Sequence, residues 1–138
     1  VFNNDKEDKF IRWNEILRQS VEQSERLWIP ELLKTAQIET WLEESALTTT
    51  SSLAIATTRR SDSKELQLWL SNLPKQLDQT WVLIGPEGGW SKEEIALSIK
   101  KGCFPVSFGE NILRTSTAAI AASQLMSSWR RITLDLSL

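Results

Sequence analysis

Residues 83–94, "LIGPEGGWSKEE", combine features that are typical of a ligand-binding loop. An apolar run ends at a glycine and a proline, a carboxylate follows, and two further glycines precede the expected start of a helix. Glycine allows a backbone to approach a ligand closely, and the free N–H groups of a helix N-terminus favour a polar or anionic ligand. The candidate residues of this loop are Gly85, Pro86, Glu87, Gly88 and Gly89.

The spacing in this loop matches neither of the common phosphate-binding patterns. A Walker A loop requires G-x-x-x-x-G-K-[ST], and Trp90 stands where the second glycine of that pattern belongs. The dinucleotide fingerprint G-x-G-x-x-G is also absent. From spacing alone, a tight strand-to-helix turn with Glu87 as a solvated carboxylate is the better interpretation.

A second candidate loop, "FGENILRTSTAA", lies at residues 108–119. A glycine again ends the expected strand, and two apolar residues and an arginine follow it. The hydroxyl residues at 115–117 offer N-caps for the last helix. The ordinary interpretation is a capped helix after a loop, with the arginine on the surface. The candidate residues are Phe108, Gly109, Ile112, Leu113, Arg114 and Ser116.

Gln23 and Arg26 form a third polar group, one helical turn apart within "SVEQSERLWIP", residues 20–30. Polar pairs at this spacing usually lie on the solvated face of a helix. The sequence by itself therefore predicts ordinary surface positions for both.

The composition limits the chemistry that these loops can perform. The chain of 138 residues has the length of one domain and contains no histidine. This excludes imidazole catalysis, a Ser-His-Asp triad and the common Cys/His zinc sites. The single cysteine, Cys103, forms no internal disulfide and indicates a reducing compartment. A net charge of −2 is not typical of a free-standing nucleic-acid binder.

No apolar stretch approaches the length of a membrane span, and no signal-peptide pattern opens the chain. We therefore expect a cytoplasmic protein that contacts neither a membrane nor a metal. The sequence begins with Val1, so we expect either a processed chain or a piece of a longer one.

The apolar pattern predicts the elements that must position these loops. Helical spacing predicts a first helix from Asp8 to about Trp28, ended by Pro30, after a frayed polar segment at 1–8. A short amphipathic helix is expected next, at 38–44, and then a turn or loop at 48–52. The later elements are strands at 53–57, 81–85 and 103–108, and helices at 62–73, 91–102 and 115–131.

Local signals support several of these bounds. Ser91 and Glu94 have capping-box spacing, and Gly102 is a plausible C-cap. Proline has no N–H to donate to a neighbouring strand. Pro105 therefore argues either against a central strand with all its hydrogen bonds or for a position at the start of a strand. The buried face of the last helix is expected to contain Ala118, Ala122, Leu125 and Trp129.

Alternation of short apolar strands with helices predicts an α/β fold built on a parallel sheet. Ligands of such sheets bind at the carboxyl ends of the strands. We therefore expect any site to lie in the loops at 57–61, 85–90 and 109–115.

Three stretches together resemble, in order, the motifs of the 16S ribosomal RNA uridine-N3 methyltransferases, the ribosomal small-subunit methyltransferase E family of the SPOUT superfamily. These stretches are "EQSER" with a following "IP", "IGPEGGWSKEEI" and "FGENILRTSTAAIAA". The resemblance covers about residues 9–130. The last two motifs are specific in combination, whereas either one alone is weak.

This resemblance implies a fold that spacing cannot show. Family members have a parallel sheet with helices on both faces, and their C-terminal segment threads through a loop to form a deep trefoil knot. The knot binds S-adenosylmethionine, which is held by the loops after the strands. The corresponding positions are Thr57, Gly85, Pro86, Glu87, Gly88, Gly89, Phe108, Gly109, Ile112 and Leu113.

The resemblance also implies a domain organisation. Residues 9–138 are expected to form the SPOUT methyltransferase domain, after a flexible segment at 1–8. The N-terminal PUA-like β-barrel that binds RNA in the family has no counterpart in this chain, so the resemblance implies the catalytic domain alone.

The resemblance also implies residues that contact the substrate. Gln23 and Arg26 match the glutamine and arginine of the family's "QSGR" motif, and Arg114 matches the arginine of the last motif. Two positions depart from the pattern, because Glu25 replaces a glycine and Ser116 replaces a glutamate. If that glutamate positions the substrate or accepts its proton, this chain has lost one carboxylate.

The implied function is S-adenosylmethionine-dependent methylation of uridine N3 in small-subunit ribosomal RNA, performed by a homodimer on the RNA or on the assembled 30S particle. Arg114 is expected to hold a phosphate or the developing anionic uracil, with assistance from Arg26. Glu87 is a weak candidate for the base. Gln23 and Ser116 are further substrate-side candidates.

Other interpretations stay open. A degenerate knot would bind RNA or a protein partner without catalysis, as the change at Ser116 would allow. A second alternative is a SPOUT methyltransferase that acts on another RNA, such as a transfer RNA ribose. A third and weaker one is a nucleotide-binding module that uses the glycine loop.

Overall fold

The computed structural model of the chain describes residues 4–44 and 50–135. The chain divides into two compact units, Val1–Ala36 and Gln37–Leu138. The methyltransferase domain predicted at 9–138 includes parts of both, and its boundaries stay a prediction.

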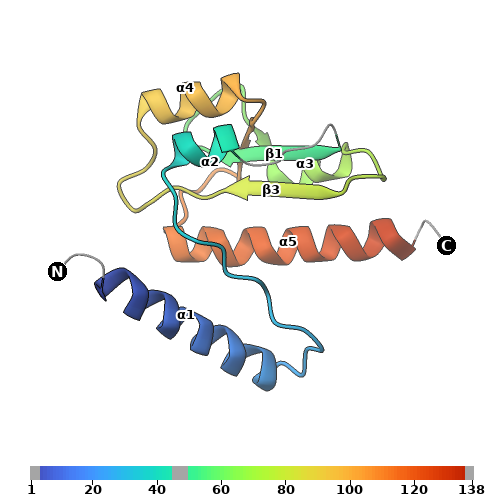
Figure 1. Cartoon of the computed structure of the whole chain (residues 1–138). Helices are drawn as coiled ribbons and strands as arrows, with labels where there is room; N and C mark the ends of the chain where they lie inside the picture. Colours follow the sequence, from blue (N-terminus) through green and yellow to red (C-terminus); the bar gives the residue numbers. More distant parts are fainter. Residues whose placement is uncertain (1–3, 45–49, 136–138) are drawn as a thin grey trace. The chain divides into compact units, whose positions relative to one another are not determined.

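The first unit contains helix α1, Asn4–Gln23, followed by a segment without regular secondary structure (Figure 1). The helix ends in a Schellman motif. The N–H of Arg26 donates to the carbonyl of Val21 at 3.1 Å, and the N–H of Glu25 donates to the carbonyl of Glu22 at 3.3 Å. Glu25 adopts the left-handed conformation that this motif requires, with φ 54.

The predicted helix from Asp8 to about Trp28 is therefore wrong at both ends. It begins earlier, at Asn4, inside the segment 1–8 that was predicted to be frayed, and it ends before Pro30 is reached. The left-handed residue at Glu25 stops it, not the proline. Gln23 is thus the last helical residue, and the interpretation of Gln23 and Arg26 as a pair on one helix face is also wrong.

Replacing Glu25 by glycine is expected to stabilise the end of α1 by about 1 kcal/mol, because an L side chain at a left-handed position costs roughly that much. Slower amide hydrogen exchange at Ser24–Arg26, with a higher urea midpoint, would show it. Arg12→Gly in the exposed middle of the same helix is the matched control and should destabilise it by a similar amount. Faster exchange in Glu25→Gly would contradict the assignment of strain to this residue.

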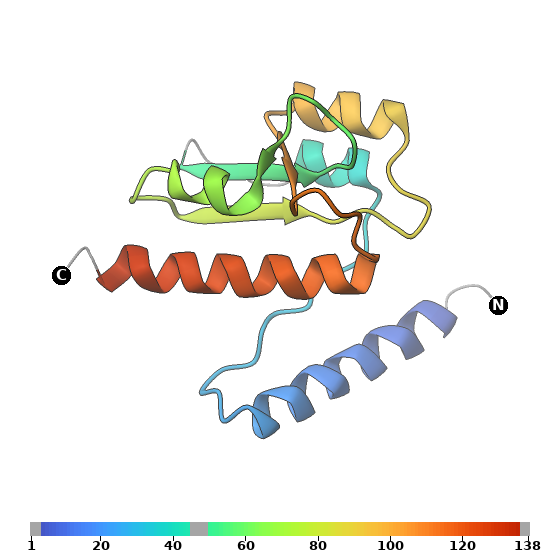
Figure 2. The ribbon, with the colours of Figure 1, turned by 180° about the vertical axis from the view of Figure 1, so that it is seen from behind.

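The second unit contains a four-stranded parallel sheet with strand order β2-β4-β1-β3. Its strands are β1 Ser51–Ala56, β2 Lys64–Glu65, β3 Gln79–Leu83 and β4 Phe104–Ser107. Its helices are α2 Ile38–Glu44, α3 Leu66–Ser71, α4 Lys92–Lys100 and α5 Thr115–Asp135 (Figures 1 and 2). The predicted α/β fold with a parallel sheet is confirmed.

Helices cover both faces of this sheet because alternate residues of each strand point to opposite sides. In β1, Leu53 and Ile55 pack with α2 and α4, whereas Ala54 packs with α3 and α5. Ala54 and Ile55 have no exposed surface. The predicted buried face of α5 is confirmed, since Ala118 and Ala122 are buried and Leu125 and Trp129 pack against the core.

Several predicted bounds change because strand pairing, which is a tertiary feature, extends or replaces local structure. Of the turn predicted at 48–52, residues 48 and 49 lie outside the described residues, and Ser51 and Ser52 belong to β1, where they pair with Gln79 and Thr80. Within the helix predicted at 62–73, Lys64 and Glu65 instead form β2, which pairs with β4. Helix α3 is left with Leu66–Ser71.

Helix α4 has the caps that the sequence predicts. Ser91 accepts from the N–H of Glu94 at 3.0 Å, and the Glu94 carboxylate accepts from the N–H of Ser91 at 2.7 Å. At the other end, Gly102 has φ 94 and closes a second Schellman motif, in which the N–H of Cys103 donates to the carbonyl of Ser98 at 2.9 Å. Burial raises the pKa of the Cys103 thiol to about 11, so this cysteine stays protonated at neutral pH.

Pro105 is the second residue of β4, which lies between β2 and β1. The pairs with β2 begin only at Val106. A proline is therefore accommodated in an interior strand, because the ladder on one side has not yet started at its position.

Candidate cofactor and substrate site

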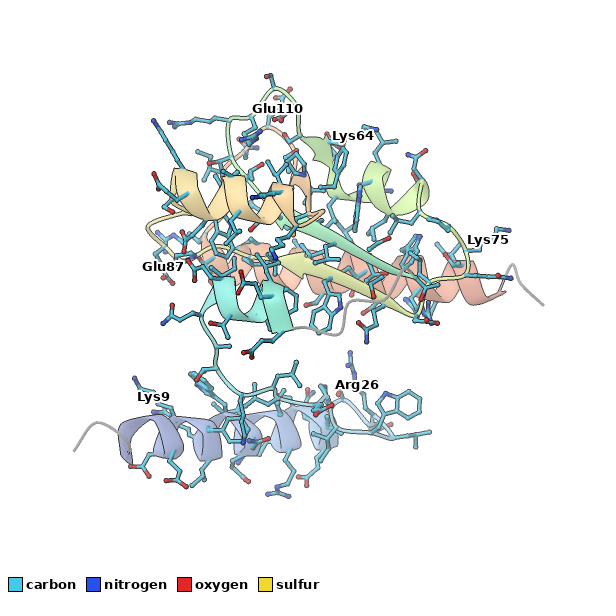
Figure 3. The ribbon with its side chains drawn as sticks, turned by 45° about the horizontal axis from the view of Figure 1, so that its top comes forward. Lys9, Arg26, Lys64, Lys75, Glu87 and Glu110 are labelled. Atoms are coloured by element: carbon cyan, nitrogen blue, oxygen red, sulfur yellow. The ribbon has the colours of Figure 1, made fainter. Side chains whose placement is uncertain are left out.

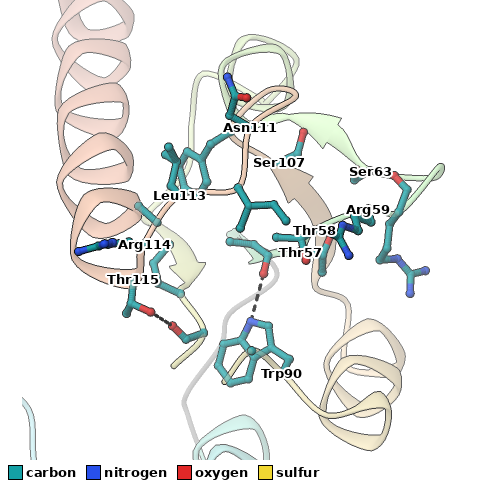
Figure 4. A pocket seen from close by; sticks show the side chains of 18 of the residues that line it. Thr57, Thr58, Arg59, Ser63, Trp90, Ser107, Asn111, Leu113, Arg114 and Thr115 are labelled. Carbon is teal, nitrogen blue, oxygen red and sulfur yellow. Dashed lines mark hydrogen bonds between the residues drawn. The ribbon is translucent and has the colours of Figure 1, made fainter. Parts of the chain in front are cut away.

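A cavity of about 1310 Å³ opens at the carboxyl ends of β1, β3 and β4 (Figure 4). It is lined by residues from the loops that follow these three strands and from the start of α5. These are the loops in which the parallel-sheet rule predicts a site. The cavity is partly open to solvent, and its volume lies above the range of about 300–1,000 Å³ that is usual for small-ligand pockets.

Two hydrogen bonds join segments that line the cavity (Figure 4). The indole N–H of Trp90 donates to the carbonyl of Ala56 at 3.1 Å and so connects the loop after β3 to the end of β1. The hydroxyl of Thr115 donates to the carbonyl of Gly85 at 3.0 Å and so connects the start of α5 to the end of β3. The cavity is therefore a cross-linked structure rather than a gap between independent loops.

The glycines of the cavity fall into two groups. A Cβ at Gly85 would lie 3.0 Å from Nε1 of Trp90, so the missing side chain makes room for the indole. At Gly88, Gly89 and Gly109 a Cβ would meet nothing within 4 Å. Their bare backbone therefore faces open space, as the backbone of a ligand-binding loop must.

Charged side chains of both signs surround this cavity. Arg59, Arg60 and Arg114 line it together with Glu65, Glu87 and Glu110. Glu87 and Glu110 are exposed on the loops after β3 and β4 (Figure 3). Arg60 holds Asp62 in a two-pronged ion pair, which lowers the pKa of that carboxyl below its ordinary value.

Arg114 is exposed and lies at the edge of the cavity (Figure 4). Its guanidinium points away from Thr57 and Trp90 in this view. Among the described residues it has no ion-pair partner within 4.0 Å. A cation in this position is available to a group that approaches from solvent.

The cavity brings together most of the residues predicted for the site. All positions predicted to contact the cofactor line it, as do Arg114 and Ser116, and the roles of these residues stay predictions. The cofactor positions are Thr57, Gly85, Pro86, Glu87, Gly88, Gly89, Phe108, Gly109, Ile112 and Leu113. Gln23 and Arg26 belong to the first unit, where both are exposed (Arg26 in Figure 3), and their part in the site also stays a prediction.

Sequence reasoning missed three residues that shape the cavity. The local pattern shows Trp90 only as a mismatch to a phosphate loop, and its bond to Ala56 depends on tertiary structure. Thr115 was considered only as a helix cap, and its bond to Gly85 depends on tertiary structure. For Arg59 a signal exists, because "TTRRS" places two cations in a loop after a strand.

Within residues 4–44 and 50–135, no helix is long and apolar enough to cross a membrane. The same part of the chain contains no group of three or more His, Cys, Asp or Glu side chains that could hold a metal ion.

Comparison with known proteins identifies the family. The family model for the RNA methyltransferase domain matches residues 1–127. The chain belongs to this RNA methyltransferase domain family. The resemblance read from the three sequence motifs is thereby confirmed.

Two curated relatives are both named ribosomal RNA small subunit methyltransferase E. The one from Synechocystis is 39% identical over 116 residues, which cover 84% of this chain and 37% of the relative. The one from Buchnera aphidicola is 34% identical over 114 residues, covering 83% and 43%. The RNA methyltransferase domain described here thus spans less than half the length of these relatives.

Two solved structures have the same fold. A methyltransferase from Legionella pneumophila with bound S-adenosylmethionine superposes with a TM-score of 0.77 at 32% identity, over 93% of this chain and 50% of that one. The ribosomal RNA small subunit methyltransferase E of Neisseria gonorrhoeae, bound to S-adenosylmethionine, gives 0.72 at 28% identity, over 88% and 49%. The chain spans about half the length of these proteins.

Proposed function

We propose that the RNA methyltransferase domain binds S-adenosylmethionine in the cavity at the carboxyl ends of β1, β3 and β4 and transfers its methyl group to N3 of a uridine in small-subunit ribosomal RNA. One observation supports this proposal above the others. Every cofactor position that the resemblance implies lines this cavity, although the positions come from three loops separated in sequence.

The lining suits this cofactor. Gly88, Gly89 and Gly109 leave open space beside their Cα atoms, so main-chain groups can contact a ligand without side chains in between. Phe108 and Leu113 offer apolar surface for a purine ring, and both line the cavity. When bound, S-adenosylmethionine supplies a methyl group that its sulfonium has already activated.

Residues of the chain must position the uridine and assist the loss of its proton. The N3 nitrogen of uridine carries a proton, and it becomes a good nucleophile only when that proton leaves. We assign Arg114 to hold a phosphate or the anionic uracil, and Glu87 to accept or orient the proton, because both line the cavity and neither has an ion-pair partner among the described residues. Arg26, Gln23 and Ser116 are assigned to substrate positioning.

The test is direct. Calorimetric titration with S-adenosylmethionine measures binding, and methyl transfer is then measured on unmodified 16S RNA, on 30S particles lacking the modification and on transfer RNA. Mass spectrometry of the digested RNA should detect N3-methyluridine from the small-subunit substrates. A methylated ribose, or methylation of transfer RNA alone, would instead support a SPOUT methyltransferase with another target.

A second candidate function is supported by Ser116, which stands exposed at the start of α5 where the family has a glutamate. A chain that binds cofactor and RNA but transfers no methyl to any of these substrates would be a non-catalytic binding domain.

Two further features are part of the proposal. We infer a SPOUT fold with a C-terminal trefoil knot from the resemblance to the family; the bond from Thr115 to Gly85, which holds the start of α5 beside the end of β3, is compatible with a threaded segment. We also infer action on ribosomal RNA in the cytoplasm. An experimental chain trace in which α5 does not pass through a loop would contradict the knot.

We also propose a homodimer. Ile120 on α5 is 72% exposed and Ile132 is 58% exposed, and burial of such side chains between two copies would stabilise association. Sedimentation at micromolar concentration should give twice the chain mass of 15.8 kDa. A monomer with full cofactor affinity would show that the site does not need a partner.

A further inference from the structure

Arg59 is a cation at the edge of the cavity for which the motifs suggest no role (Figure 4). It is exposed, and its backbone has φ 55, in the left-handed region that favours glycine. Such a conformation is strained for a residue with a side chain, and strained residues of this kind cluster at functional sites.

The loop around Arg59 is held in place on both sides. Before it, the N–H of Thr57 donates to the carbonyl of Val106 at 2.8 Å, which continues the sheet. After it, Asp62 accepts two bonds from the guanidinium of Arg60, and the hydroxyl of Ser63 donates to the carbonyl of Arg60 at 2.8 Å. The side chain of Arg59 is therefore presented by a fixed loop rather than by a loose one.

The charges of this loop leave one cation available. Arg60 is neutralised by Asp62, whereas Arg59 has no ion-pair partner within 4.0 Å among the described residues. In Figure 4, Arg59 and Arg114 lie on opposite sides of the cavity. A strand of RNA that places one nucleotide in the cavity has a phosphate on each side of that nucleotide.

We propose that Arg59 binds a backbone phosphate of the RNA substrate, on the side of the cavity opposite Arg114. This inference rests on the proposed function, because it takes RNA as the substrate of the same cavity. An RNA phosphate fits better than the carboxylate of the cofactor, since Arg59 is exposed at the entrance and the open glycine backbones lie on the other two loops. The planar guanidinium matches the geometry of a phosphate.

The experiment uses the full-length protein and three variants. Arg59→Gly removes the side chain and relieves the left-handed strain, so it should fold at least as well as the wild type. Arg59→Lys keeps the charge. Arg131→Ala is the matched control, because it removes one exposed cation near the end of α5 and outside the cavity. RNA affinity is measured on small-subunit RNA at several salt concentrations with S-adenosylhomocysteine present.

Arg59→Gly should weaken RNA binding about five- to tenfold and reduce the slope of log affinity against log salt by about one. KM for RNA should rise while kcat and the affinity for S-adenosylmethionine stay the same. Arg59→Lys should retain the salt slope, and Arg131→Ala should behave like the wild type.

Other outcomes overturn the inference. If Arg59→Gly and Arg131→Ala bind RNA with the same affinity and salt slope, Arg59 contacts no phosphate. If Arg59→Gly weakens cofactor binding and leaves RNA binding unchanged, the anion is the cofactor carboxylate. Wild-type protein that transfers no methyl would refute the proposed function, and the RNA-binding measurements would still decide the role of Arg59. Wild-type protein that binds no RNA would refute both.

Discussion

Replacing Gly89 by valine will weaken the binding of S-adenosylmethionine at least tenfold, or about 1.4 kcal/mol. Two effects combine at this position. Gly89 has φ 76, which a β-branched residue adopts only with strain, and its Cα faces the open space in which we propose that the cofactor lies. A side chain there would both displace the loop and occupy the ligand's place. Calorimetric titration of purified wild-type and variant proteins measures the change.

The matched control for this variant is Gly102→Val. Gly102 also has a positive φ, of 94, and a Cβ there would likewise meet nothing within 4 Å, but the residue caps α4 and does not line the cavity. Both variants should lose about 1–2 kcal/mol of unfolding free energy, and only Gly89→Val should lose cofactor affinity. Equal cofactor affinity in the two folded variants would remove Gly89 from the cofactor site.

Replacing Arg114 by alanine will reduce methyl transfer more than tenfold and leave cofactor affinity nearly unchanged. The sulfonium of the cofactor is itself positive, so a neighbouring guanidinium is of more use to an anionic substrate. Arg114 is exposed at the edge of the cavity, where RNA would arrive. Initial rates on small-subunit RNA at saturating cofactor measure the loss. Arg114→Lys should recover part of the rate, and Arg131→Ala should match the wild type.

A large loss of cofactor binding in Arg114→Ala would place this residue on the cofactor rather than on RNA. A second variant, Ser116→Glu, restores the carboxylate of the family and should keep or raise the rate of methyl transfer. If the wild type transfers no methyl and Ser116→Glu does, the non-catalytic interpretation replaces the enzymatic one.

Features set by local sequence could be predicted for this chain. The apolar runs around Ile55 and Val82 indicated strands, and Ser91 and Gly102 marked both ends of α4, because strand burial and helix caps depend on residue type and short spacing. The position of the cavity could also be predicted from the sequence. In a parallel sheet, the loops after neighbouring strands must meet at one edge, whichever order the strands adopt.

Features set by tertiary contacts could not be predicted. Strand β2 consists of Lys64 and Glu65, which have no strand-forming character and are extended only because they pair with β4. The end of α1 depends on a left-handed glutamate, a conformation that residue type argues against. In the site, the bond from Trp90 to Ala56 joins positions 34 residues apart, so no spacing rule reveals it.

The contact between Gly85 and Trp90 has an evolutionary consequence. The indole occupies the place that a Cβ at position 85 would need, and it donates the bond that joins the loop after β3 to β1. A substitution at position 90 alone removes that cross-link, and a larger residue at position 85 alone creates a clash. Each single substitution is therefore disfavoured, whereas both together avoid the clash. The two positions are therefore expected to covary among descendants of this domain, with larger residues at 85 accompanied by smaller ones at 90.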